Sequence, residues 1–177
     1  MDASNDNDLS VLAKAVVTGD LDRVRQLIRA GHTVGWEPFP FEQTALHFAA
    51  DRGRADIIAV LLDGGGASYI DSLGLGWTPL GMAARKGHGD AVRVLIASGA
   101  DVDAHDAEHI GNTPLADAVQ GRFPDIVDDL VSAGADPTIP GWMNLTALDR
   151  AKRRHEKGGD DTDRRILNAV LKASRKL

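Results

Sequence analysis

One short segment of this sequence recurs about every 34 residues, and this repetition restricts the possible folds more than any other feature. The segment opens with a serine or threonine, and a leucine follows two residues later, as in TPLGMAARKG from Thr78. The opening residues, called anchors below, are Ser10, Thr44, Thr78, Thr113 and Thr146. Their spacings of 34, 34, 35 and 33 residues indicate a solenoid, in which each repeat buries its apolar faces against its neighbours.

The same offsets within each repeat predict two short helices. The anchor hydroxyl caps the first helix, and small residues such as Ala83 and Ala84 let neighbouring helices approach closely. A second apolar run, for example Ala91-Val92-x-x-Leu95-Ile96, places its side chains on one helical face. The leucines two residues after the anchors are Leu12, Leu46, Leu80, Leu115 and Leu148.

Glycines mark the predicted helix ends. We expect the first helices to end at Gly19, Gly53, Gly87 and, one residue early, Gly121. Gly99 and Gly134 follow two of the second helices, as a C-terminal glycine should. In the last repeat, an insertion at HEKGGDDTD precedes a second helix expected over residues 164–174.

The stretches TALHFAA…G…DIIAVLL and TPLGMAARKGHGDAVRVLIASGADVDA resemble ankyrin repeats. The resemblance implies an all-α solenoid of stacked helix-turn-helix units with projecting β-turn fingers. It covers one domain, residues 8–174, with units near 8–40, 41–74, 75–109, 110–142 and 143–174; we expect the acidic residues 1–7 to be disordered. The histidine that this family carries after the leucine is present only as His47, so fewer hydrogen bonds between neighbouring turns are expected.

Composition narrows the classes of function. The chain has no cysteine, which excludes disulfides and thiolate metal sites. Its acidic N-terminal residues are unlike a leader peptide, and no apolar run approaches the ~20 residues of a membrane helix. The net charge of −6 argues mildly against nucleic acid as the partner. We therefore expect a cytoplasmic monomer without a cofactor or a membrane contact.

The resemblance implies a concave groove formed by the turns and the solvent sides of the first helices. On these positions the sequence places a row of large apolar residues beside a row of cations, a composition typical of interface hot spots. The predicted partner-binding residues are Trp36, Phe41, Arg52, Leu75, Trp77, Arg85, Lys86, Ile110, Trp142, Met143, Arg153 and Arg154. In the alternative interpretation, the tryptophans pack between adjacent turns and the cations form an ordinary solvated face.

Two other classes of function stay open. The turn at residues 101–112 carries His105 and His109 among carboxylates, so it is an alternative metal-dependent or catalytic site. The basic first helices are an alternative nucleic-acid surface. The C-terminal helix is also basic, but no aromatic stacking platform accompanies it. There is no G-x-S-x-G elbow and no P-loop. The leading hypothesis is a non-catalytic module that binds a protein with an acidic and apolar surface, as an inhibitor, adaptor or immunity-type protein.

Overall fold

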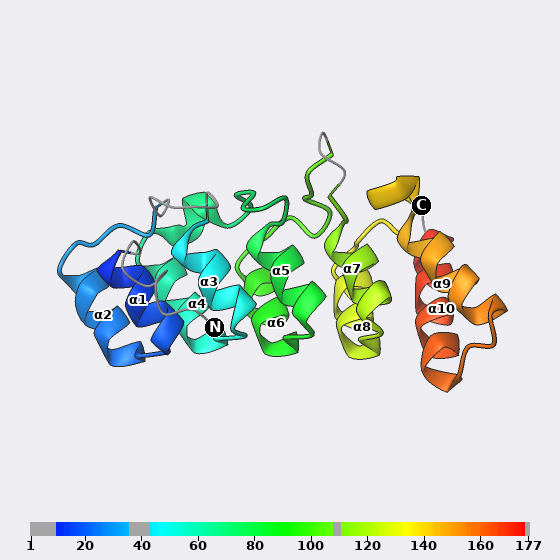
Figure 1. Ribbon diagram of the computed structural model, residues 1–177, viewed down its shortest axis with the longest axis horizontal. Coiled ribbons are helices and arrows are strands. Elements are labelled where there is room, and N and C mark those ends of the chain that lie inside the picture. Colours follow the sequence, from blue (N-terminus) through cyan, green and yellow to red (C-terminus); the bar gives the residue numbers. More distant parts are fainter. Residues whose placement is uncertain (1–9, 36–42, 108–110, 176–177) are drawn as a thin grey trace, which may run out of the picture.

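The computed structural model is a row of helical hairpins, with loops projecting from one edge of the row (Figure 1). It describes residues 10–35, 43–107 and 111–175. The α-helices in order are α1 (Val11–Thr18), α2 (Leu21–Arg29), α3 (Ala45–Asp51), α4 (Ala55–Asp63), α5 (Pro79–Lys86), α6 (Gly89–Ala97), α7 (Pro114–Gly121), α8 (Pro124–Ser132), α9 (Ala147–Glu156) and α10 (Asp161–Ser174). Two 3₁₀ turns, η1 (Gly66–Tyr69) and η2 (Trp142–Asn144), lie in the projecting loops.

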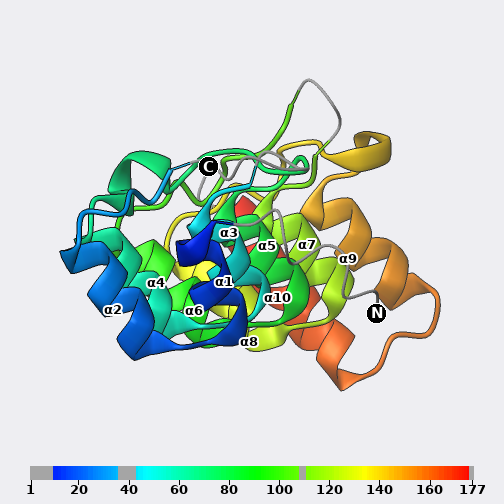
Figure 2. The ribbon, with the colours of Figure 1, turned by 60° about the vertical axis from the view of Figure 1, so that its left-hand side comes forward.

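The helices form two layers. The first helices of the hairpins, α1, α3, α5, α7 and α9, pack side by side in one layer, and α2, α4, α6, α8 and α10 pack in the other (Figure 2). Each hairpin thus contacts the one before it and the one after it, which confirms the predicted all-α solenoid. No helix in the described part of the chain has both the length and the apolar character needed to cross a membrane.

The anchor residues cap the first helices as predicted. Thr78 Oγ1 accepts a hydrogen bond from the amide of Gly81 at 3.1 Å, and Thr113 Oγ1 accepts one from the amide of Ala116 at 3.2 Å. These bonds satisfy amides that have no partner inside the helix. Pro79 and Pro114 occupy the first helical position, where a missing N–H costs nothing.

The core follows the repeated leucines and alanines. Leu12, Leu46, Leu80 and Leu115 are fully buried, whereas Leu148 in the last hairpin is only partly buried. The alanines of the first helices are buried with them, because their small side chains let the helices approach closely. The apolar stripe of each second helix closes the core from the other side; in α6 it consists of Ala91, Val92 and Leu95.

His47 links the second and third hairpins. Its Nδ1 accepts a hydrogen bond from the Thr44 amide at 3.1 Å, and its Nε2–H points at the carbonyl oxygens of Ser72 and Trp77, at 3.0 and 3.1 Å. Burial lowers the pKa of His47 to about 4, against the smaller opposing effect of the two carbonyls. The imidazole is therefore a neutral structural link, as its position in the sequence predicts.

One predicted helix boundary was wrong, and one helix end differs in its cap. Helix α7 ends at Gly121 as predicted, but the residue that takes the left-handed conformation after it is Arg122 (φ 62°). Arg122 stands nine residues after its anchor, as Gly53 and Gly87 do after theirs, and those two glycines also have positive φ. Helix α10 begins three residues before the expected start, because the side chain of Asp160 accepts a hydrogen bond from the Asp163 amide and caps the helix there.

Candidate functional site

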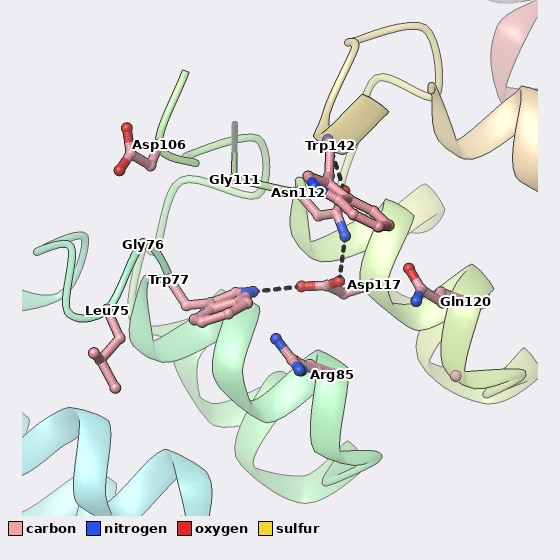
Figure 3. A pocket seen from close by; sticks show the side chains of 11 residues that line it. Leu75, Gly76, Trp77, Arg85, Asp106, Gly111, Asn112, Asp117, Gln120 and Trp142 are labelled. Atoms are coloured by element: carbon pink, nitrogen blue, oxygen red, sulfur yellow. Dashed lines mark hydrogen bonds between the residues drawn. The ribbon is translucent and has the colours of Figure 1, made fainter. Parts of the chain in front are cut away.

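A cleft of about 630 Å³ opens between the turn that precedes α5 and the turns that precede α7 and α9 (Figure 3). Its walls include two indoles, and we call it the tryptophan cleft. Its lining residues are Leu75, Gly76, Trp77, Arg85, Asp106, Gly111, Asn112, Asp117, Gln120, Gly121 and Trp142. The structure thus brings together four of the predicted binding residues, Leu75, Trp77, Arg85 and Trp142. Three of them belong to the turn before α5 and to α5 itself, and Trp142 belongs to the turn before α9.

Trp77 is held in place on two sides. Its Nε1–H donates a hydrogen bond to Asp117 Oδ2 at 2.8 Å. The guanidinium carbon of Arg85 lies 4.3 Å from the centre of its ring, a cation–π contact. Trp77 is partly buried and packs against the core, so it serves both as a wall of the cleft and as a link between the third and fourth hairpins.

Asn112 joins the other wall to the same carboxylate. Its Nδ2 donates to Asp117 Oδ1 at 2.8 Å. Its Oδ1 accepts from the Trp142 amide at 3.0 Å and from Arg150 Nη2 at 2.9 Å. In Figure 3, Trp77 lies to one side of Asp117, and Trp142 lies above it, with Asn112 bonded to both Asp117 and Trp142. One connected network therefore positions the indole of Trp77 and the backbone of Trp142.

Asp117 is the buried charge at the centre of this network. Burial raises its pKa, and the hydrogen bonds from Asn112 and Trp77 and the charges of Arg85 and Arg150 oppose that rise. Both of its oxygens are occupied by protein donors. Asp117 therefore orients the walls of the cleft, and its hydrogen bonds are made within the protein.

The turn tips expose large apolar side chains. The exposed fraction is 49% for Leu75, 52% for Trp142 and 64% for Met143. Leu75 and Met143 also have positive φ, 56° and 61°, a conformation that costs energy for residues with a Cβ. Both stand three residues before an anchor. Strained backbone that displays an apolar side chain to solvent is a feature of binding sites.

The predicted cations separate into three places. Arg52 and Lys86 both approach Asp51, at 3.5 and 3.0 Å, on α3 and α5. Arg85 lies in the tryptophan cleft. Arg153 and Arg154 line a second cleft of about 480 Å³, which we call the arginine cleft. The lining residues of the arginine cleft are Gln120, Arg150, Arg153, Arg154, Lys157, Gly158, Gly159 and Asp163.

The remaining predicted residues do not join these two clefts. Met143 lines a smaller hollow beside them, with Gly111 and Pro140. Trp36, Phe41 and Ile110 lie outside the described residues.

Sequence reasoning missed Asp117 and Arg150. Each stands four residues after its anchor, where the second and third repeats carry Phe48 and Met82. A charged residue at an offset that is apolar in the second and third repeats was the available signal, although the first repeat also has a charged residue there, Lys14. This signal alone could not reveal the network, because Asp117 and Arg150 are connected through Asn112, which bonds to both.

The alternative metal site in the turn at residues 101–112 is only partly described. Asp103 accepts hydrogen bonds from the Asp136 amide at 3.0 and 3.2 Å, and His105 Nδ1 lies 2.8 Å from the Asp103 carbonyl oxygen. Burial raises the pKa of Asp103. Within residues 10–35, 43–107 and 111–175, no three histidine or carboxylate side chains gather as metal ligands would. His109 lies outside these residues.

Comparison with known proteins gives consistent matches to one family. A family model described as ankyrin repeats (3 copies) matches residues 9–106 and again residues 64–140. Mouse protein phosphatase 1 regulatory subunit 27 is 36% identical over 110 residues, which are 62% of this chain and 69% of that protein. The mouse B-cell lymphoma 3 protein homologue is 31% identical over 160 residues, 87% of this chain but 35% of the relative. Drosophila melanogaster palmitoyltransferase Hip14 is 41% identical over 99 residues, 55% of this chain and only 15% of the relative.

Proposed function

Because this chain belongs to the ankyrin repeat family, we propose that it is a non-catalytic module that binds a partner protein through its first-helix face. This face comprises the exposed sides of α1, α3, α5, α7 and α9 and the turns that precede them. Ankyrin repeats generally mediate interactions between proteins. The module would span about residues 8–174, act as a monomer, and work by occupying its partner as an inhibitor, adaptor or immunity-type protein.

The observation that carries this proposal is the exposure of apolar turn tips beside a preformed cleft. Leu75, Trp142 and Met143 are each 49% exposed or more, although each would gain from leaving water. Aromatic and arginine side chains are the residues that contribute most to binding energy at interfaces. Since the hydrogen bonds of Asp117 and Asn112 already hold the walls of the cleft, little ordering entropy would oppose binding.

The predicted residues contribute unequally to this proposal. Trp142, Leu75 and Met143 have exposed surface to offer, and Arg85 has its guanidinium in the tryptophan cleft. Arg52 and Lys86 share Asp51, so part of their charge is neutralised within the protein. We propose Trp142 and Leu75 as the main apolar contacts of the partner.

Affinity capture with matched variants tests the proposal. The intact chain, a Leu75→Ala/Trp142→Ala variant and a Val11→Ala variant are each immobilised, and captured proteins are identified by mass spectrometry. Val11 is 50% exposed and lies at the start of α1, at the end of the first-helix face that is farthest from the cleft. It therefore controls for the loss of exposed apolar surface on this face outside the two main contacts. We expect a partner that the wild type and Val11→Ala retain and that the double variant loses. A partner retained equally by all three would place the interface elsewhere.

A further inference from the structure

The arginine cleft has an excess of positive charge in an acidic protein. Four cations and one carboxylate line it: Arg150, Arg153, Arg154, Lys157 and Asp163. The chain as a whole has a net charge of −6. The cleft is therefore a local reversal of the overall charge, and it would attract acidic groups that the rest of the surface repels.

The single carboxylate of the cleft is already paired. Asp163 Oδ1 lies 3.1 Å from Arg122 Nε and 3.7 Å from Arg154 Nε. Arg150 donates to neutral acceptors, including Gln120 Oε1 at 3.0 Å. Within the described part of the chain, Arg153 and Lys157 form no ion pair. The positive charge of these two residues is thus available to an external anion.

The helix dipole accounts for only part of this arrangement. Arg153 and Arg154 lie in the last turn of α9, where cations are favoured. Arg150, however, lies one turn earlier and is directed to Gln120 and to Asn112 of the preceding repeat. Arg154 likewise reaches the Gln120 carbonyl oxygen at 3.1 Å. The cations therefore converge on the boundary between the last two hairpins.

The two clefts are adjacent. Gln120 lines both of them, and Arg150 also donates to the carbonyl oxygen of Trp142 at 3.0 Å, at the wall of the tryptophan cleft. An extended segment that places a side chain beside Trp142 would therefore meet the arginine cleft with its neighbouring residues.

The tryptophan cleft itself suits an apolar side chain. Both oxygens of Asp117 accept hydrogen bonds from within the protein, and Arg85 already occupies one face of the Trp77 ring. The exposed half of Trp142 offers indole surface to an entering group. Burial of an aliphatic or aromatic side chain there would remove apolar area from water on both partners.

We propose that the two clefts together bind one extended peptide segment of the partner, in which an apolar anchor side chain enters the tryptophan cleft and acidic side chains follow over Arg153 and Lys157. This proposal rests on the proposed function and specifies the chemistry of the partner. The apolar anchor provides the larger share of the affinity. The acidic residues set the direction of the segment and accelerate the encounter.

A display library of random linear peptides, selected on the full chain, tests this proposal. We expect the selected sequences to share an apolar residue followed in a fixed register by aspartate or glutamate. A fluorescein-labelled selected peptide is then measured by fluorescence polarisation. Trp142→Ala should weaken its binding about 30-fold, and Arg153→Glu/Lys157→Glu about tenfold.

Matched variants separate a specific contact from a general change of charge. Arg29→Glu/Lys172→Glu makes the same change of charge on α2 and α10, at two exposed residues of the opposite layer. We expect this control to bind the peptide within about twofold of the wild type, because exposed charges beyond a Debye length are screened. Added salt should weaken the wild type but not the Arg153→Glu/Lys157→Glu variant.

Each other result has a defined meaning. Selected peptides without acidic residues, sensitive to Trp142→Ala but not to the charge reversal, would overturn this proposal and leave the proposed function standing. Peptides insensitive to both changes, or no peptide selected, would overturn the proposal, and the affinity capture would then decide the proposed function separately. Binding of labelled single-stranded DNA in place of peptide, lost in Arg153→Glu/Lys157→Glu, would assign the cleft to nucleic acid instead.

Discussion

The joint between the second and third hairpins and the joint between the fourth and fifth use the same helical geometry but different polar contacts. At the first, His47 is buried and neutral, and it bonds backbone carbonyls of the next turn. At the second, Arg150 and Arg154 reach Gln120, and Arg122 pairs with Asp160 and Asp163. The first joint also has an exposed ion pair, between Lys86 and Asp51, but its buried polar contact is an imidazole that stays uncharged. The polar contacts of the second joint are made mainly by charges that salt screens.

The largest expected effect tests the apolar core that both joints share. Leu80 is fully buried in α5, between α3 and α7, and Leu80→Ala should lower the free energy of unfolding by about 2–5 kcal/mol. The equivalent Leu148 is only partly buried, so Leu148→Ala should cost less. Urea unfolding followed by circular dichroism measures both. A loss below about 0.5 kcal/mol at Leu80, the level of surface substitutions, would contradict the packing.

The second prediction concerns the joint at His47, whose stability should depend on pH. The pKa of His47 falls from 6.5 to about 4 on folding, so the unfolded chain binds a proton in this window while the folded chain does not. The contribution of the neutral His47 to the free energy of unfolding is fully present above pH 6.5. It is lost as the pH falls towards 4, so the free energy of unfolding should decrease by about 3 kcal/mol over this range. Urea midpoints across this range measure it.

His47→Gln supplies the control for this pH dependence. It removes the titrating group, so the difference in stability between wild type and variant should shrink steadily from pH 7 to pH 4. A difference that is constant with pH would show that His47 is not buried in its neutral form.

The fold was predictable from the sequence because each structural position is repeated. The anchors, the buried leucines and the paired alanines each recur at one offset. An assignment made in one repeat can therefore be tested at the same position of the others. The left-handed residue after α7 could have been predicted in the same way, since Arg122 occupies the offset of Gly53 and Gly87. The rule that glycine marks a helix end pointed only to Gly121, the last residue of α7.

The tryptophan cleft was predictable only in part. Leu75, Trp77, Arg85 and Trp142 could be assigned to one face, because their offsets place them on turns and on the solvent side of the first helices. The buried network could not be assigned, since Asp117 and Asn112 matter only through contacts that span three repeats. Offsets within a repeat say which side a residue faces, but not which residues of other repeats it meets.

A smaller effect is expected at the network between the two joints. Asp117→Ala leaves the Trp77 indole N–H and the Asn112 amide without their acceptor, so it should lower the free energy of unfolding by about 1–3 kcal/mol. Trp77→Phe removes one of the two donors. In a double-mutant cycle, Asp117→Ala should cost less in the Trp77→Phe background. Equal costs in both backgrounds would show that the bond between Trp77 and Asp117 contributes nothing to stability.

The smallest effect concerns Arg122, at the ion-paired joint. Two substitutions there separate the cost of its left-handed backbone from the contribution of its ion pairs. Arg122→Gly loses the pairs with Asp160 and Asp163 but relieves the left-handed conformation, whereas Arg122→Ala loses the pairs and keeps the strain. We expect both variants to unfold at a lower temperature than the wild type, with the glycine variant roughly 2–4 °C above the alanine variant. Added salt should narrow the gap between wild type and Arg122→Gly, because it screens only the pairs, and it should leave the gap between the two variants unchanged. A gap between wild type and Arg122→Gly that salt does not alter would mean that the ion pairs of Arg122 contribute nothing to joining the last hairpin.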